Sequence, residues 1–212
     1  MEGFNLGILI PAYNEDQTVR EVISEARKFG TVIISDDYSV DDTKNLAKKA
    51  GAYVISNTFE KGYEGNLKTL LKFAAEEGNF SHFITIDADG ELPASEIRKF
   101  IDISKSCDLC IGQRNKLNRT VEFILGIYFY FRYGIKDPIS GMKFYSKDLL
   151  VDFYKDSREL NLGTSIIKFC KINNYKIKTI DIKVQKRRDM SRFGDDFFTQ
   201  LKMTRTVFKD FL

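Results

Sequence analysis

The sequence is poor in the residues that mark several special classes of protein. Its 212 residues include only three cysteines, three prolines and one histidine. With 14 glycines besides the three prolines, a collagen-like or low-complexity architecture is excluded. An odd number of cysteines does not build a disulfide framework. The net charge of +3, from 33 Lys and Arg against 30 Asp and Glu, is too small to indicate a nucleic-acid partner.

Long apolar runs are also missing. Residues 1–5 show no basic segment leading into an apolar stretch, so we expect no secretory signal peptide. The longest apolar stretch, residues 121–135, contains Glu122 and Arg132 and is shorter than the roughly 20 residues of a membrane span. We therefore expect a cytoplasmic protein without a transmembrane anchor of its own. The 43% of hydrophobic residues are enough to bury a core in one domain.

Cys107 and Cys110 have the Cys-x-x-Cys spacing of a redox pair or of half a zinc site. Only Cys170 and His82 remain as further soft ligands, so a four-ligand zinc site is hard to assemble. The favoured interpretation is a buried strand end with small apolar thiols.

Short β-branched runs alternate with segments of helical periodicity. This alternation predicts βαβ units, and hence an α/β fold with a mostly parallel sheet covered by helices on both faces. We find no internal repeat and no linker, which favours one domain. The predicted strands cover residues 6–10, 31–35, 52–56, 82–86 and 109–112, and the predicted helices residues 16–29, 42–50 and 65–77.

Carboxylates stand directly after two of these runs, where parallel sheets bind their ligands. Asp87 and Asp89 follow the fourth run; two carboxylates at positions i and i+2 can converge on one hard cation such as Mg²⁺, although surface turns also carry such pairs. Asp36, at the tip of the second run, is well placed to bind a nucleobase or ribose. Asp41 serves equally well as a helix cap.

Two common phosphate-binding loops are absent from the sequence. It contains no Gly-x-x-x-x-Gly-Lys-Ser/Thr loop, and no Gly-x-Gly-x-x-Gly follows the first strand, so P-loop NTPases and dinucleotide dehydrogenases lose their main support. Phosphates would instead be bound through a metal and through arginines, whose planar guanidinium suits diphosphate oxygens. Individually, each arginine is more often a solvated surface charge. The basic candidates are Arg114, Arg119, Lys186, Arg187, Arg188 and Arg192.

Three segments in order resemble family 2 glycosyltransferases, which are inverting enzymes of the GT-A fold. They are Ile8–Glu15, Ser35–Thr43 and the pair within Asp87–Gly90. Three later segments are similar to the dolichol-phosphate mannose synthase branch of that family. They are Ile111–Arg114, Asp137–Lys143 and Arg188–Gly194.

The resemblance implies a GT-A domain over residues 1–195 with a donor site, a metal site and phosphate contacts. Asp87 and Asp89 would coordinate Mg²⁺ or Mn²⁺ on the diphosphate of a nucleotide sugar. The implied donor-binding residues are Pro11, Tyr13, Glu15, Asp36 and Asp87, and the implied phosphate-binding residues are Arg114, Arg119, Arg188 and Arg192. The catalytic candidates are Asp89, Arg114 and Asp137. Asp137 is a possible base, or a residue that only fixes the turn before Pro138.

One position departs from the family pattern. An acidic residue usually opens the helix before the final strand, but this chain has Ser165 there, with Glu159 as the nearest carboxylate. A phosphate acceptor is already anionic and needs no general base, so the departure favours a polyprenyl phosphate at the cytoplasmic membrane face. The alternatives are a glycan-extending transferase acting on a sugar hydroxyl and a non-catalytic nucleotide-sugar-binding subunit.

Two segments could bring the protein to a membrane surface. Residues 121–133, with six aromatic residues, suit either a core helix or strand pair, or an interfacial segment that admits a polyprenyl chain. The second segment, residues 196–212, is expected to form an amphipathic helix that packs on the domain, on the membrane surface or on a partner protein. Its apolar face would hold Phe197, Leu201, Thr204, Phe208 and Phe211.

Overall fold

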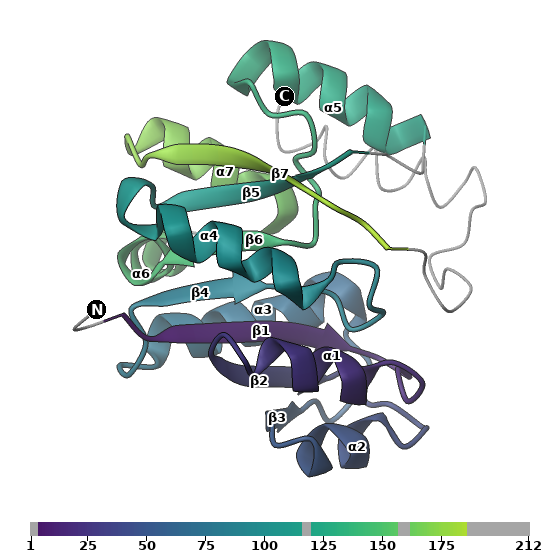
Figure 1. Cartoon of the computed structure of the whole chain (residues 1–212). Coiled ribbons are helices and arrows are strands. Elements are labelled where there is room, and N and C mark those ends of the chain that lie inside the picture. Colours follow the sequence, from purple (N-terminus) through teal and green to yellow (C-terminus); the bar gives the residue numbers. More distant parts are fainter. Residues whose placement is uncertain (1–3, 116–119, 157–161, 186–212) are drawn as a thin grey trace.

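The computed structural model describes residues 4–115, 120–156 and 162–185. These residues form an α/β fold around a seven-stranded sheet of order β3-β2-β1-β4-β6-β5-β7 (Figure 1). Strand β6 is antiparallel to both of its neighbours, and the other described pairings are parallel, as predicted. The strands are β1 (Leu6–Ala12), β2 (Thr31–Asp36), β3 (Tyr53–Ser56), β4 (His82–Thr85), β5 (Leu109–Arg114), β6 (Lys143–Ser146) and β7 (Ile177–Ile182).

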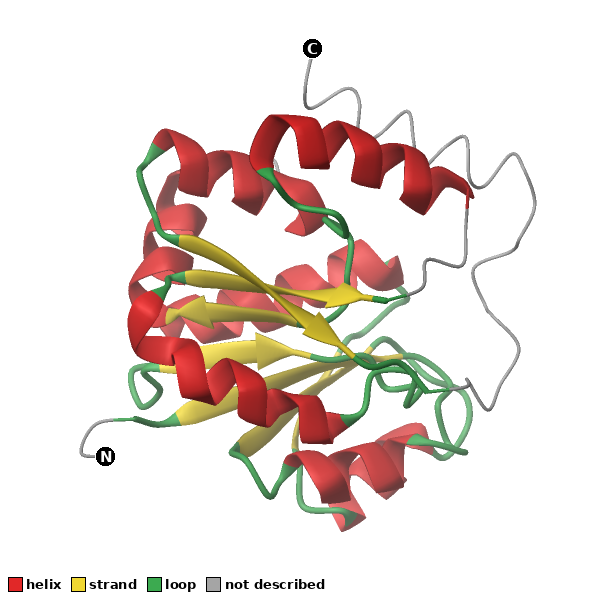
Figure 2. Ribbon diagram, turned by 45° about the horizontal axis from the view of Figure 1, so that its top comes forward, coloured by secondary structure: helices red, strands yellow, loops and turns green. Residues whose placement is uncertain are grey.

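Helices cover both faces of this sheet (Figure 2). The helices α1 (Val19–Ala26), α2 (Thr43–Lys49) and α4 (Ile97–Ile103) pack into one buried cluster, and α3 (Gly62–Glu76), α6 (Lys147–Asp156) and α7 (Leu162–Ile172) into the other. In β1, Ile8 and Ile10 join the first cluster, while Leu9 joins the second. This alternation explains why β1 is apolar throughout, since a parallel strand between two helical layers is buried on both sides.

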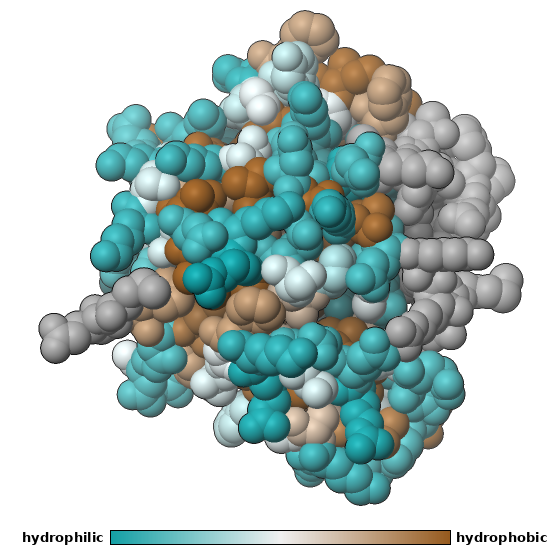
Figure 3. Space-filling view, viewed as in Figure 1, coloured by the Kyte–Doolittle hydropathy of each residue, from teal (hydrophilic) through white to brown (hydrophobic). Residues whose placement is uncertain are grey.

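Residues 121–133 belong to a helix and not to a strand pair. Helix α5 (Thr120–Tyr133) lies at the top of Figure 1, beyond β7. Leu125 and Phe129, on the inner side of α5, are buried, whereas the outer face of the helix is apolar and exposed (Figure 3). That face holds Phe123, Ile124, Ile127, Tyr130 and Phe131, with 45% to 84% of each exposed. None of the helices in the described ranges is both long and apolar enough to cross a bilayer.

The remaining structural predictions have different outcomes. Cys107, Cys110 and Cys170 are buried thiols, in agreement with the apolar interpretation of the Cys-x-x-Cys pair. Asp42, and not Asp41, is the N-cap residue of α2 (Thr43–Lys49), and it makes no side-chain capping hydrogen bond. Asp41 lies one position earlier, and its Oδ1 accepts a hydrogen bond from the first N–H of the helix, that of Thr43, at 3.0 Å. The predicted helix over residues 196–212 lies outside the described residues and stays a prediction.

Candidate active site

The loops after β1 and β2 are tied to each other at the carboxyl edge of the sheet. The Asn14 N–H donates to Ser39 Oγ at 2.9 Å, and the Val40 N–H donates to Asn14 Oδ1 at 2.9 Å. Asn14 and Tyr38 adopt left-handed backbone angles, with φ of 52° and 66°, which asparagine tolerates better than most residues. The two loops therefore form one rigid wall beside the strand ends.

The residues predicted to bind the donor from the first loop have distinct surroundings. Pro11 is buried within β1, and the Tyr13 hydroxyl donates to Glu60 Oε2 at 3.1 Å. Glu15 makes hydrogen bonds just before the start of α1. Its backbone carbonyl accepts from the N–H groups of Thr18 and Val19, and its carboxylate accepts from Thr18 Oγ1 at 3.1 Å. Pro11 and Glu15 thus shape this wall from within the fold.

Two adjacent carboxylates at the end of β2 have opposite environments. Asp37 accepts hydrogen bonds from Asn57 Nδ2 at 2.9 Å and from the Lys61 N–H at 3.0 Å, so it holds the start of α3. Asp36 is only 3% exposed, and its Oδ1 is enclosed without a hydrogen-bond partner in the described part of the chain. A buried polar atom without a partner is costly. Asp36 therefore carries an unsatisfied acceptor at the carboxyl end of β2, which a ligand donor would satisfy.

The acidic pair follows β4 as predicted. Asp87 Oδ1 accepts a hydrogen bond from the Tyr63 hydroxyl at 3.2 Å, and Asp89 Oδ1 accepts one from the Glu91 N–H at 2.8 Å. Burial, and then the negative charge of Asp89, raise the pKa of Asp87 to about 6. The two carboxylates thus repel each other. A side chain at Gly141 would collide with the Asp87 carboxylate, so the glycine lets the loop before β6 pass close to it.

These carboxylates fit a divalent cation. Their oxygens are the hard ligands that Mg²⁺ and Mn²⁺ take, and a cation between them would relieve the repulsion. Among the described residues there is no group of three His, Cys, Asp or Glu side chains that could hold a metal. Of the described residues, these two carboxylates would therefore be ligands, and waters and substrate phosphates could supply others, as is common for Mg²⁺.

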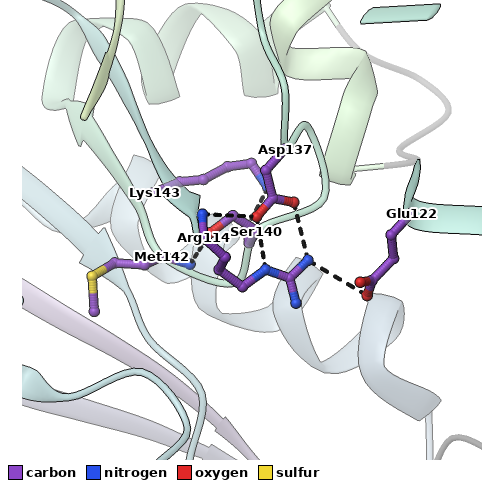
Figure 4. Close-up of polar contacts among 6 residues, drawn as sticks. All are labelled: Arg114, Glu122, Asp137, Ser140, Met142 and Lys143. Atoms are coloured by element: carbon purple, nitrogen blue, oxygen red, sulfur yellow. Dashed lines mark hydrogen bonds and ion pairs between the residues drawn. The ribbon is translucent and has the colours of Figure 1, made fainter. Parts of the chain in front are cut away.

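Arg114, at the end of β5, is held between two carboxylates (Figure 4). Its Nε donates to Asp137 Oδ2 at 2.7 Å and its Nη2 to Asp137 Oδ1 at 3.0 Å. Glu122 Oε1 lies 3.4 Å from the same Nη2. Burial opposes the charge of Arg114, but its hydrogen bonds and ion pairs with these carboxylates outweigh that effect and raise its pKa. The guanidinium is therefore always charged.

Asp137, which was predicted as a possible base, is paired with Arg114 in the structure. Its side chain is 1% exposed, and both of its oxygens accept hydrogen bonds from the Arg114 guanidinium. The geometry therefore favours Asp137 as the residue that positions Arg114.

Three residues near this site have roles that the sequence did not reveal. Lys143 in β6 is 5% exposed, its Nζ donates to the Ser140 carbonyl at 2.7 Å, and burial lowers its pKa to about 8. Tyr63 contacts Asp87, and Glu122 contacts Arg114. In the sequence, Glu122 is visible only as a charge inside an apolar stretch. Its partner is 8 positions earlier, at Arg114, on another element.

The other predicted site residues have separate outcomes. Ser165 lies in α7, the helix directly before β7, as expected from the family pattern. Arg119, Arg188 and Arg192 lie outside the described residues, as does Glu159.

Comparison with known families decides the identity. The family model described as glycosyl transferase family 2 matches residues 7–133. The chain belongs to glycosyl transferase family 2. In this family 2 member, the matched region includes the acidic pair, Asp36 and Arg114.

Relatives of this family 2 chain include two archaeal transferases. Glycosyltransferase AglJ of Haloferax volcanii is 26% identical over 198 residues, which cover 87% of this chain and 64% of AglJ. The UDP-N-acetylglucosamine–dolichyl-phosphate N-acetylglucosaminyltransferase of Methanococcus voltae is 26% identical over 181 residues, 68% of this chain and 70% of that enzyme. The chain therefore spans less than two thirds of the length of AglJ.

Solved structures confirm the GT-A fold of this family 2 chain. Glucosyl-3-phosphoglycerate synthase from Mycobacterium tuberculosis superposes with a TM-score of 0.72 at 16% identity, covering 98% of this chain and 79% of that structure. That enzyme was crystallised with Mn²⁺, uridine-diphosphate-glucose and phosphoglyceric acid.

Proposed function

We propose that this protein transfers a sugar from a nucleoside-diphosphate sugar to a polyprenyl phosphate, with inversion at the anomeric carbon. The observation that carries the proposal is the set of groups at the carboxyl edge of the sheet. Asp36, with its enclosed and unpartnered oxygen, follows β2; the pair Asp87 and Asp89 follows β4; and Arg114 ends β5. Along this edge, from β2 through β4 to β5, these groups would contact in turn the base or ribose of the donor, its diphosphate and the anionic acceptor.

The donor half of the site uses residues on the first four strands. Asp36 accepts a hydrogen bond from the nucleobase or the ribose, which removes the cost of its unpartnered oxygen. Pro11, Tyr13 and Glu15 form the adjacent wall. Asp87 and Asp89 would hold Mg²⁺ or Mn²⁺, and a bound cation would neutralise charge on the nucleoside diphosphate leaving group.

The acceptor half centres on Arg114. Asp137 fixes its guanidinium in one orientation, and the predicted contacts of Arg119, Arg188 and Arg192 add further positive charge for phosphates. A phosphate oxygen of the acceptor attacks the anomeric carbon while the bond to the diphosphate breaks. Because a phosphate monoester is already ionised near neutral pH, Ser165 is sufficient where other family members carry an acidic residue.

The apolar outer face of α5 supports a lipid acceptor. Exposed Phe123 and Phe131, with the exposed aromatic Tyr130, are the residue types found at the headgroup boundary of a membrane. The relative from Methanococcus voltae is named for a dolichyl-phosphate acceptor. Together these features favour a peripheral position at the inner face of the cytoplasmic membrane.

A transfer assay tests the proposal. The protein is incubated with UDP-, GDP- or CDP-sugars, Mn²⁺ and a short polyprenyl phosphate, and lipid-linked sugar is measured after extraction. Transfer to saccharide hydroxyls with none to lipid phosphate would contradict the acceptor and favour a glycan-extending enzyme. Binding of a nucleoside diphosphate without turnover on either acceptor would favour a non-catalytic binding subunit.

A further inference from the structure

The two carboxylates of the acidic pair are held in different ways. Asp89 Oδ1 accepts a hydrogen bond at 2.8 Å from the N–H of Glu91, two positions later in the same turn. Asp87 Oδ1 accepts one at 3.2 Å from the hydroxyl of Tyr63, which stands 24 positions earlier, in the first turn of α3. The orientation of Asp87 therefore depends on another element of the fold, whereas Asp89 has a partner within its own turn.

The start of α3 is fixed to the sheet. Asp37, directly after β2, accepts hydrogen bonds at 3.0 and 3.1 Å from the N–H of Lys61, the residue before the helix. One turn further on, Asn66 is 2% exposed, and its Nδ2 donates to the carbonyl of Ser35 in β2 at 2.9 Å. Because the helix is anchored at both places, the Tyr63 hydroxyl reaches the acidic pair with little further loss of conformational entropy.

A second element also confines the Asp87 carboxylate. Gly141, in the loop before β6, lies so close that a Cβ at this position would collide with it. Thr85 Oγ1 holds that loop in place by donating to the Gly141 carbonyl at 2.8 Å. The Tyr63 hydroxyl keeps its proton near neutral pH and therefore donates to the carboxylate. Hydrogen bonds of this kind orient carboxylates that bind metals, and their loss commonly costs about 10-fold to 100-fold in metal affinity or activity.

We infer that Tyr63 is a positioning residue for the metal site, because its hydroxyl fixes the Asp87 carboxylate in the orientation in which Asp87 and Asp89 receive one divalent cation together. Tyr63 acts through Asp87 and needs no contact of its own with the cation. The inference rests on the metal-dependent part of the proposed function. It adds to the site a residue on α3, a helix that carries none of the site residues predicted from the sequence.

Binding of Mn²⁺ tests the inference directly. Free Mn²⁺ is measured by electron paramagnetic resonance in titrations with saturating UDP, GDP or CDP, which give both the Kd and the number of sites. We expect Tyr63→Phe, which keeps the ring and removes the hydroxyl, to raise the Kd about tenfold. Tyr53→Phe removes a hydroxyl from a 59% exposed tyrosine on β3 and should keep the wild-type Kd. Unfolded protein would lower only the number of sites, so the Kd of the folded fraction still decides.

A double-mutant cycle distinguishes the positioning of Asp87 from a general effect on the fold. In the Asp87→Ala background, the carboxylate through which Tyr63 acts is gone. Adding Tyr63→Phe to that background should therefore change the Kd for Mn²⁺ by less than about twofold. A loss of about tenfold in both backgrounds would overturn the inference, because it would show that Tyr63 acts independently of Asp87.

The outcomes separate the inference from the proposed function. Mn²⁺ binding by the wild type, with an unchanged Kd in Tyr63→Phe, would overturn only the role of Tyr63. A raised Kd in Tyr63→Phe, in a wild-type protein that transfers no sugar to polyprenyl phosphate, would support the role of Tyr63 and contradict the proposed acceptor. Wild-type protein that binds no Mn²⁺ with any of the three nucleoside diphosphates would overturn both the proposed metal site and the role of Tyr63.

Discussion

The proposed donor half and the proposed acceptor half of the site are built in different ways. Around the ends of β1 and β2, neutral hydrogen bonds tie neighbouring loops together, and one oxygen, Asp36 Oδ1, is left without a partner in the described residues. Around the end of β5, the groups are charged, and the cation already has two carboxylate partners. In the function that we propose, the donor would therefore give a hydrogen bond to an unpartnered acceptor in the first region, whereas the acceptor would approach a cation that is already paired in the second.

The largest expected effect on activity comes from removing one carboxylate of the acidic pair. We expect Asp89→Ala to lower kcat/KM by more than about 100-fold, because charge stabilisation at the leaving group is a dominant part of such a reaction. The variant should also lose Mn²⁺-dependent binding of the nucleoside diphosphate, measured by calorimetry. Asp102→Asn, on the exposed side of α4, serves as the control, and turnover of Asp89→Ala at the wild-type rate would refute the metal assignment.

The acceptor half should be the more sensitive one in stability. Replacing Asp137 by Ala leaves Arg114 buried with less compensation, so we expect the free energy of unfolding in urea to fall by about 3 kcal/mol or more. The exposed pair of Lys28 and Glu25 is the comparison, where Glu25→Gln should cost less than about 1 kcal/mol. Similar losses in the two variants would remove the contrast between a buried charge network and a surface pair.

In the donor half, a substitution should weaken ligand binding without lowering the free energy of unfolding. Asp36→Asn is expected to weaken binding of a nucleoside diphosphate by about tenfold, since one charged hydrogen bond is lost. The same change should leave the free energy of unfolding unchanged or raise it, because it removes a buried carboxylate with one unpartnered oxygen. Ser35→Ala, which removes the neighbouring enclosed hydroxyl, should leave nucleotide binding unchanged. Equal weakening in both variants would contradict a specific contact by Asp36.

The smallest effect, on the pH dependence of stability, is expected at the start of β4, at the end of the strand that faces away from the site. His82 stacks between Phe4 and Phe144, with ring centroids 5.0 and 5.1 Å away, and burial lowers its pKa, with Asp148 opposing the shift only in part. The unfolded chain therefore binds the proton more readily. This contribution to stability is fully present above the ordinary pKa of 6.5 and is lost as the pH falls below it. Urea unfolding at pH 7.5 and 5.5 should show a smaller pH effect in His82→Phe than in the wild type.

The strands of the sheet differ in how readily the sequence predicted them. Strands β1, β2 and β4 were predictable because each is a continuous apolar run that polar residues end. Strand β6 was not predicted, since Lys143–Ser146 is only four residues long and begins with a buried lysine. Its antiparallel pairing depends on β4 and β5, which lie far away in the sequence.

Neighbouring carboxylates show where local sequence stops being informative. Asp36 and Asp37 are chemically identical and adjacent, yet Asp37 holds the N–H of Lys61, 24 positions later, while Asp36 keeps an oxygen without a partner. Arg114 was predicted to contact phosphate, but Asp137 and Glu122 reach it from 23 and 8 positions away. No local pattern encodes such pairs, because they form only when separate elements pack.

The sequence by itself therefore determined the α/β architecture, the family and the candidate residues at the strand ends. Apolar periodicity and short motifs are local, and burial on both faces of a parallel strand follows from them directly. Only the tertiary structure decided which carboxylate keeps an oxygen without a partner among the described residues, which ones hold the start of a helix and which ones hold Arg114. Those roles depend on distances of 2.7 to 3.4 Å between groups from different elements, and on burial, which sets how strongly the charges act.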